Sequence, residues 1–96
     1  MSHRGQVETR GDIAILWVDH PPVNAIDTGV KRLLVEGLAQ AQADPAVRAL
    51  VIACRGRTFM AGADIREFDD IISGRVVPPD ALAALAAFGK PLVAAI

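Results

Sequence analysis

Two short runs near the start of the chain, at residues 6–10 and 13–18, read as strands on either side of Gly11-Asp12. The second run is continuously apolar, which is typical of a strand covered on both faces. It ends before Pro21-Pro22, because proline cannot donate a hydrogen bond to a strand ladder. The pattern therefore predicts two strands that meet at a turn.

A helix is predicted next, because the apolar period changes from that of a strand to that of a helix. Asp27 or Thr28 can cap its start, and Asp44-Pro45 stops it. The positions expected to form its buried face are Val30, Leu33, Leu34, Gly37, Leu38 and Ala41.

The second half repeats this alternation of strand and helix. Residues 49–54 read as a buried strand, 64–72 as a helix, and Asp80 as the cap of an Ala/Leu-rich helix that runs through Phe88. A last buried strand is predicted from Pro91 onward, and the sequence stops within it. Because natural termini are usually exposed and polar, we expect a truncated α/β domain.

Composition narrows the class of protein. The 96 residues are 52% hydrophobic and 22% charged with a net charge of -1, which predicts one globular domain. Near-neutral charge and scattered basic residues predict no nucleic-acid or membrane partner. The polar start lacks a signal-peptide pattern, so a cytoplasmic location is expected. Cys54, His3 and His20 show no metal-ligand spacing.

The segment at residues 59–68 is the best candidate for chemistry. It lies between a predicted buried strand and a predicted helix, where open α/β sheets bind ligands. Its small residues Ala61, Gly62 and Ala63 allow a ligand to approach the backbone, and amides at a helix start can stabilise an oxyanion. The residues alone also fit a tight turn that serves only packing, and by themselves they favour that interpretation over a ligand site.

Four segments taken together are more specific. They read P-P-V-N-A-I at 21–26, D-P-A-V-R-A-L-V-I at 44–52, F-M-A-G-A-D-I at 59–65 and K-P-L-V-A-A-I at 90–96. They resemble, in the same order, the P-x-x-N-A-[LI], D-x-x-[VI]-R-x-x-[VI]-[VI], F-x-A-G-A-D-[IL] and K-P-x-[VI]-A-A-[VI] motifs of the enoyl-CoA hydratase/isomerase (crotonase) superfamily. The resemblance covers nearly the whole chain from Gly11 onward.

This resemblance implies an α/β fold of repeated ββα turns, the crotonase-like spiral (ClpP/crotonase fold), truncated here after its first units. Residues 1–96 are then the N-terminal portion of a single domain that is incomplete at its C-terminus. Members of the family usually assemble as trimers or hexamers, so a homo-oligomer is expected for the full-length protein.

The resemblance also implies an acyl-CoA thioester as the substrate, with coenzyme A as part of it and no separate cofactor. The thioester carbonyl of the family lies between two backbone N–H groups, the first of which Ala63 would supply. The positions expected to line the substrate are Val23, Ala25, Ala61, Gly62, Ala63, Asp64 and Ile65. In the family, the second N–H group and the catalytic glutamates follow the segment that matches residues 90–96, so we expect this chain by itself to catalyse nothing.

Other polar residues have ordinary structural interpretations. The acidic residues Asp64, Glu67, Asp69 and Asp70 fit one solvated helix better than a metal site. Cys54 fits a small core residue and His20 a surface turn. Arg55 and Arg57 fit either solvated loop charges or contacts to phosphate. The glycines match neither a dinucleotide-binding nor a P-loop motif.

Our first functional hypothesis is a 2-enoyl-CoA hydratase of β-oxidation, in some relatives followed by a hydroxyacyl-CoA dehydrogenase. The alternatives are another crotonase-type reaction, such as isomerisation or thioester hydrolysis, and a non-catalytic fragment that self-associates. An RNA-binding relative would need a basic stripe, and the chain has none.

Overall fold

Strands β1 (Gly5–Arg10) and β2 (Ile13–Val18) form an antiparallel hairpin at one edge of the sheet. A computed structural model shows this arrangement and describes residues 4–60, 62, 73–74 and 79–95. Gly11 takes the left-handed conformation (φ 62°) in the connecting turn, where glycine meets no steric penalty. The predicted pair of strands is confirmed.

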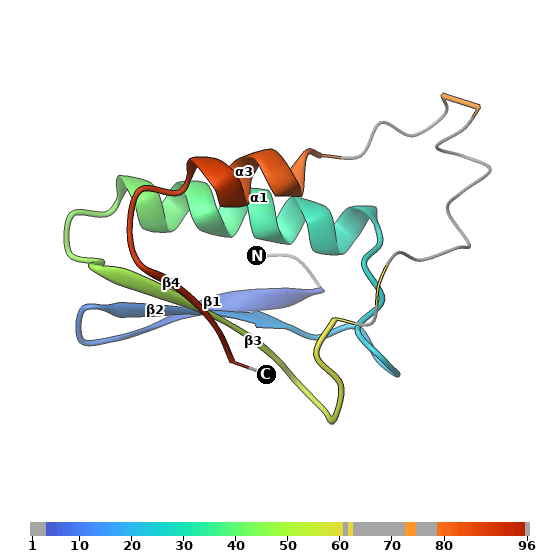
Figure 1. Cartoon of the computed structure of the whole chain (residues 1–96). Coiled ribbons are helices and arrows are strands. Elements are labelled where there is room, and N and C mark those ends of the chain that lie inside the picture. The colour runs from blue at the N-terminus through green and yellow to red at the C-terminus, as the bar shows by residue number, and fades with distance from the viewer. Residues whose placement is uncertain (1–3, 61, 63–72, 75–78, 96) are drawn as a thin grey trace.

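The sheet continues with β3 (Ala49–Cys54) and β4 (Leu92–Ala95), each parallel to the strand before it, in the order β1-β2-β3-β4. Parallel neighbours need a crossover connection, usually a helix. Helices α1 (Thr28–Ala43) and α3 (Ala81–Ala87) supply these crossovers, and both lie on the same face of the sheet (Figure 1). The helix predicted for residues 64–72 lies outside the described residues.

The core lies between α1 and the central strands. Each helix position expected to be buried is buried, namely Val30, Leu33, Leu34, Gly37, Leu38 and Ala41. They meet alternate residues of β2 and β3, among them Leu16 and Leu50, which are fully buried. A Cβ atom on Gly37 would lie 2.4 Å from a methyl carbon of Leu16. Glycine at this position therefore lets the helix approach the sheet closely.

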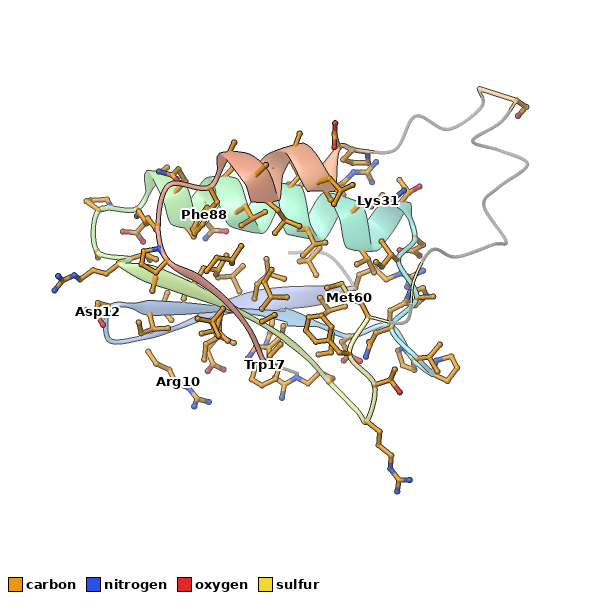
Figure 2. All side chains as sticks on the ribbon, viewed as in Figure 1. Arg10, Asp12, Trp17, Lys31, Met60 and Phe88 are labelled. Carbon is orange, nitrogen blue, oxygen red and sulfur yellow. The ribbon has the colours of Figure 1, made fainter. Side chains whose placement is uncertain are left out.

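The prediction that β2 is covered on both faces is wrong for the described residues, because both described helices lie on one face. Ile13, Ile15 and Trp17 alternate with the buried positions and stay partly exposed. Figure 2 shows Trp17 on the face turned away from the helices, where the guanidinium of Arg55 stacks 4.0 Å from the centre of its ring.

The prediction of a buried final strand is also wrong for the described part of the chain. All residues of β4 are exposed, with Val93 at 54%. Among the described strands, β4 pairs with β3 alone, so it forms the second edge of the sheet. Its Val, Leu and Ala content predicted burial, but burial depends on which element covers an edge.

Lys90 links the turn before β4 by hydrogen bonds to the end of α1 and to the loop before β3. Its ammonium group donates to three backbone carbonyls, those of Ala41 at 2.8 Å, Asp44 at 2.8 Å and Val47 at 2.6 Å. The last carbonyls of a helix have no partner within the helix and carry its negative end. The lysine therefore caps α1 and links it to two later segments.

We expect Lys90→Met to lower the free energy of unfolding by about 2 kcal/mol, because hydrogen bonds to a charged donor are lost and carbonyls remain unpaired. Urea denaturation measures this loss. Arg32→Met, which removes a charge from an exposed position of α1, is the control and should cost much less. Equal losses in the two variants would contradict the assigned role.

Candidate functional site

The P-P-V-N-A-I segment forms a turn between β2 and α1 that is organised around Asn24. This asparagine is 2% exposed and has a left-handed backbone (φ 55°), which asparagine tolerates better than most residues. Its backbone N–H donates to the His20 carbonyl at 2.7 Å. The turn thus folds back on itself at Asn24.

The side chain of Asn24 ties this turn to the loop after β3. Its amide oxygen accepts from the His20 N–H at 2.8 Å. Its amide nitrogen donates to two carbonyls of the loop, Arg55 at 2.9 Å and Thr58 at 2.6 Å. One buried side chain therefore holds the ends of two neighbouring strands together.

A backbone hydrogen bond then joins the two motif turns directly. The N–H of Ile26 donates to the carbonyl of Gly62 at 2.6 Å. Gly62 has φ 115° and is exposed, and residues other than glycine rarely adopt this backbone conformation. The structure thus brings together two segments that lie far apart in the sequence.

His20 is buried (6% exposed), so its assignment to the surface is wrong. Its Nδ1 lies 2.8 Å from the Ala25 carbonyl oxygen, and since a carbonyl only accepts, Nδ1 carries the proton. Its Nε2 lies 3.7 Å from a carboxylate oxygen of Asp27. The folded turn buries a residue that its neighbouring prolines suggested was exposed.

Asp27 combines a capping role with an ion pair. Its carboxylate accepts from the Val30 N–H at 2.8 Å, which makes it the N-cap of α1, and from Arg4 Nε at 2.9 Å. Burial by itself raises the pKa of Asp27, but the Val30 hydrogen bond and the bond and charge of Arg4 bring it below the ordinary value of 3.8. The carboxylate is therefore ionised and holds the first turn of the helix.

An apolar cavity of about 350 Å³ lies beside the joined turns, between the start of α1 and α3. Ile26 and Met60, one from each motif segment, contribute to its wall, and Lys31 and Asp80 are its charged lining residues. Figure 2 shows Met60 and Lys31 at the same end of the molecule. The remaining lining residues are Leu34, Ala81, Leu82 and Leu85.

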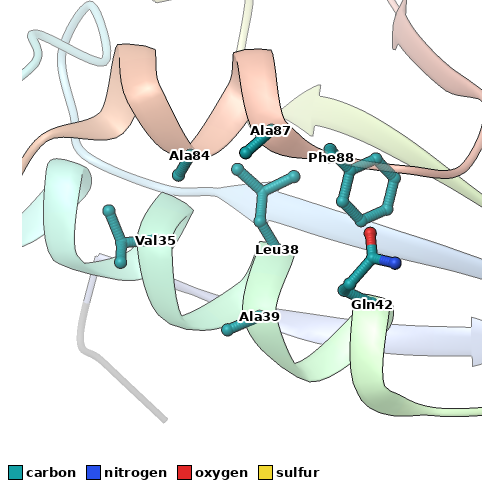
Figure 3. Close-up of a pocket in the computed structure, with 7 residues that line it drawn as sticks. All are labelled: Val35, Leu38, Ala39, Gln42, Ala84, Ala87 and Phe88. Carbon is teal, nitrogen blue, oxygen red and sulfur yellow. The ribbon is translucent and has the colours of Figure 1, made fainter.

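A second groove, of about 210 Å³, lies further along the same two helices (Figure 3). It is lined by Val35, Leu38, Ala39, Gln42, Ala84, Ala87 and Phe88. At this end the Gly89 N–H donates to the Gln42 side chain at 2.7 Å. None of these residues belongs to the motif turns, so this groove is a helix packing seam.

The structure describes three of the expected substrate-lining residues. Val23 is 42% exposed, Ala25 is partly buried, and Gly62 is exposed. Gly62 accepts the hydrogen bond between the turns, and Ala25 directly precedes its donor, Ile26. The other expected positions, Ala61, Ala63, Asp64 and Ile65, lie outside the described residues, as do the remaining acidic residues at 67, 69 and 70.

The remaining candidates have structural surroundings. Burial raises the pKa of the Cys54 thiol, while a hydrogen bond from the Met60 backbone lowers it, and the net direction is upward. A raised pKa disfavours the thiolate that a nucleophile needs, which supports the core interpretation. Arg55 and Arg57 are exposed. In the described part of the chain, no three His, Cys, Asp or Glu side chains gather as metal ligands, and neither helix could cross a membrane.

Comparison with known proteins places this site in a family. Residues 8–96 match the family described as enoyl-CoA hydratase/isomerase, and the chain belongs to this family. A peroxisomal bifunctional enzyme of Danio rerio is 39% identical over 84 residues, which are 88% of this chain and 12% of that protein. A probable enoyl-CoA hydratase of Bacillus subtilis (strain 168) is 32% identical over 90 residues, covering 88% of this chain and 35% of that protein.

Solved structures of enoyl-CoA hydratases also match the fold of this chain. The enoyl-CoA hydratase EchA8_6 of Mycobacterium marinum superposes with a TM-score of 0.84 at 26% identity, over 97% of this chain and 47% of that one. The expected crotonase-like α/β fold is thereby confirmed. The chain spans less than half the length of each of these relatives.

Asn24 and His20 are the site residues that sequence reasoning missed. Asn24 was visible as one letter of a motif, but two of its hydrogen-bond partners lie more than 30 positions away. His20 gave no signal, because its burial depends on how the turn folds.

Asp27→Asn should make stability less dependent on pH. The folded state lowers the pKa of Asp27 below 3.8, so its carboxylate stabilises the fold above that pH and loses this effect as the pH falls through the folded pKa. We expect the variant, which can still cap the helix, to be about 1 kcal/mol less stable at neutral pH.

The measurement is urea denaturation of both proteins at neutral pH and at about pH 3. The difference between the two should shrink in acid. A difference that stays constant or grows in acid would contradict the role given to the ionised carboxylate.

Proposed function

We propose that this chain forms the acyl-CoA-binding part of an enoyl-CoA hydratase, which adds water to a 2-trans-enoyl-CoA to give a 3-hydroxyacyl-CoA. Membership of the family and the hydratase named among its relatives support this reaction. The observation that carries the proposal is the hydrogen bond between Ile26 and Gly62. It brings the two motif turns together beside an apolar cavity.

The bond has a direct consequence for carbonyl binding. The Gly62 carbonyl belongs to the same peptide group as the N–H of residue 63, and a peptide group is planar. We therefore infer that a bond that fixes the carbonyl would also restrict the direction of that N–H. We propose that this N–H donates to the thioester oxygen, where negative charge develops as water adds to the double bond.

The cavity beside the turns suits the acyl chain. Its lining is mainly aliphatic, and Ile26 and Met60 connect it to the motif turns. Each methylene group transferred from water to such a site contributes about 0.8 kcal/mol. Lys31 and Asp80 supply polar groups near an otherwise apolar space, an arrangement common in ligand sites.

Proton transfer requires an acid and a base, and the described residues of the two motif segments, 21–26, 59–60 and 62, include neither. We expect the acid and base to come from the part of the protein that the relatives have beyond this match. Isomerisation and thioester hydrolysis, which need the same polarised carbonyl, are the alternative reactions. Oligomeric assembly and a cytoplasmic location stay predictions.

The first test compares Gly62→Ala with wild type in the full-length protein. Alanine at φ 115° is strained, so we expect the peptide group to rotate and the kcat/KM for hydration of a 2-enoyl-CoA to fall about 100-fold, as when an oxyanion donor is lost. Hydration is followed by the disappearance of the conjugated thioester absorbance.

Gly11→Ala is the matched control, because Gly11 also has a positive φ (62°) and open space around its Cβ position. It lies in the turn between β1 and β2, and its variant should keep the wild-type kcat/KM. Equal rates for Gly62→Ala and wild type would overturn the role of the turn. A wild-type protein that binds no acyl-CoA and self-associates instead would overturn the proposed function.

The second test concerns the cavity. Leu85→Trp should fill it and lower the kcat/KM for a long-chain enoyl-CoA at least tenfold relative to a four-carbon substrate, because several methylene groups lose their site. Ala39→Trp, which fills the packing groove of Figure 3 instead, should leave this ratio unchanged. A shift of the ratio in both variants, or in neither, would exclude the cavity as the acyl site.

A further inference from the structure

We propose that Asn24 is a positioning residue for binding of the thioester carbonyl, an inference that rests on the proposed function. Asn24 itself is 2% exposed, and both its amide oxygen and its amide nitrogen bond to backbone groups. It therefore acts on substrate through the turns that it joins. Its task is to hold the Gly62 carbonyl in register with the Ile26 N–H.

The chemistry of the site requires an amide. One oxygen must accept from the His20 N–H, and one nitrogen must donate to both Arg55 and Thr58 carbonyls. A carboxylate could accept but not donate, and a serine hydroxyl has a single proton. The left-handed backbone (φ 55°) further restricts the position, and of the residues with a short amide or acid side chain both Asn and Asp tolerate it.

Two links connect Asn24 to Gly62. Through the turn, Asn24 lies two residues before Ile26, whose N–H donates to the Gly62 carbonyl at 2.6 Å. Through the loop, its partner Thr58 lies four residues before Gly62. The hydrogen bonds of Asn24 and the Ile26–Gly62 bond thus close one ring of contacts. Loss of the asparagine would let the two turns shift relative to one another.

Such a shift should affect one part of the ligand selectively. A backbone donor that is displaced by even a fraction of an ångström loses its hydrogen bond to the thioester oxygen. Most residues that line the proposed acyl cavity lie on α1 and α3, and we expect the nucleotide to bind outside the joined turns, so the contribution of both to affinity should largely remain. This selectivity distinguishes positioning of the carbonyl from a general loss of structure.

The experiment measures Kd by titration calorimetry for two ligands with wild type and Asn24→Asp, in the full-length protein. One ligand is a saturated acyl-CoA thioester, and the other is the S-alkyl-CoA thioether of equal length, which lacks the carbonyl. Asn24→Asp keeps the acceptor and the backbone tolerance but loses both donated bonds. We expect its thioester Kd to rise about tenfold, the effect of one lost hydrogen bond, and its thioether Kd to change less than about twofold.

Two control variants make the result specific. Gln42→Glu makes the same amide-to-acid change where the side chain accepts from the Gly89 N–H, away from the motif turns. Val47→Ala removes apolar contacts from a buried residue (5% exposed) at the opposite end of β3. Both should keep the wild-type ratio of thioester to thioether Kd, even where thermal stability falls. If Asn24→Asp does not fold, Asn24→Gly, which accepts the left-handed backbone, replaces it.

The outcomes separate the two proposals. Equal weakening of both ligands in the Asn24 variant, or no weakening of either, would overturn the positioning role and leave the proposed function standing. Wild-type protein that binds neither ligand would overturn the proposed function and this inference with it.

Discussion

The structure depends on a simple requirement, that a buried polar group must find a partner within the protein. The ends of β2 and β3 leave backbone carbonyls and N–H groups that no strand ladder satisfies. Asn24 supplies the missing partners to three of them. Because leaving a single buried group unpaired costs about 1–3 kcal/mol, the two turns have few alternative arrangements. A ligand would therefore meet turns that are already in place.

Hydrogen bonds from polar side chains and the apolar core stabilise the fold in different ways. The core formed by α1, β2 and β3 is made of aliphatic residues with little directional preference. Directional hydrogen bonds are made at the two ends of the sheet, by Lys90 before the start of β3 and by Asn24 after its end. Both residues bind backbone carbonyls, so they fix the course of the chain independently of the side chains around them. The helix cap at Asp27 likewise binds a backbone group, the Val30 N–H, and so fixes the start of α1.

The proposed separation of carbonyl binding from proton transfer would allow one family to support several reactions. Under the proposed function, backbone groups of the joined turns bind the thioester carbonyl, and any acyl-CoA reaction that develops charge on the thioester oxygen can use them. Under the same proposal, side chains that move protons decide between hydration, isomerisation and hydrolysis, and the described residues of the two motif segments, 21–26, 59–60 and 62, include no acid or base. In this proposal the aliphatic cavity between α1 and α3 sets the preference for the acyl chain and takes no part in the reaction. The proposed function thus assigns binding and reaction type to different parts of the protein.

The sequence by itself determined the strands, both described helices, the cap of α3 at Asp80 and the buried face of α1, because these follow from periodicity and local capping chemistry. It left Asp27 and Thr28 as alternative caps of α1, and the structure decided for Asp27. The motifs indicated the family. Tertiary structure alone decided that His20 is buried, that β4 is exposed, and that Asn24 and Gly62 belong to one ring of contacts. Burial and long-range hydrogen bonds depend on which segments meet, and no local pattern at residue 20, 24 or 62 carries that information.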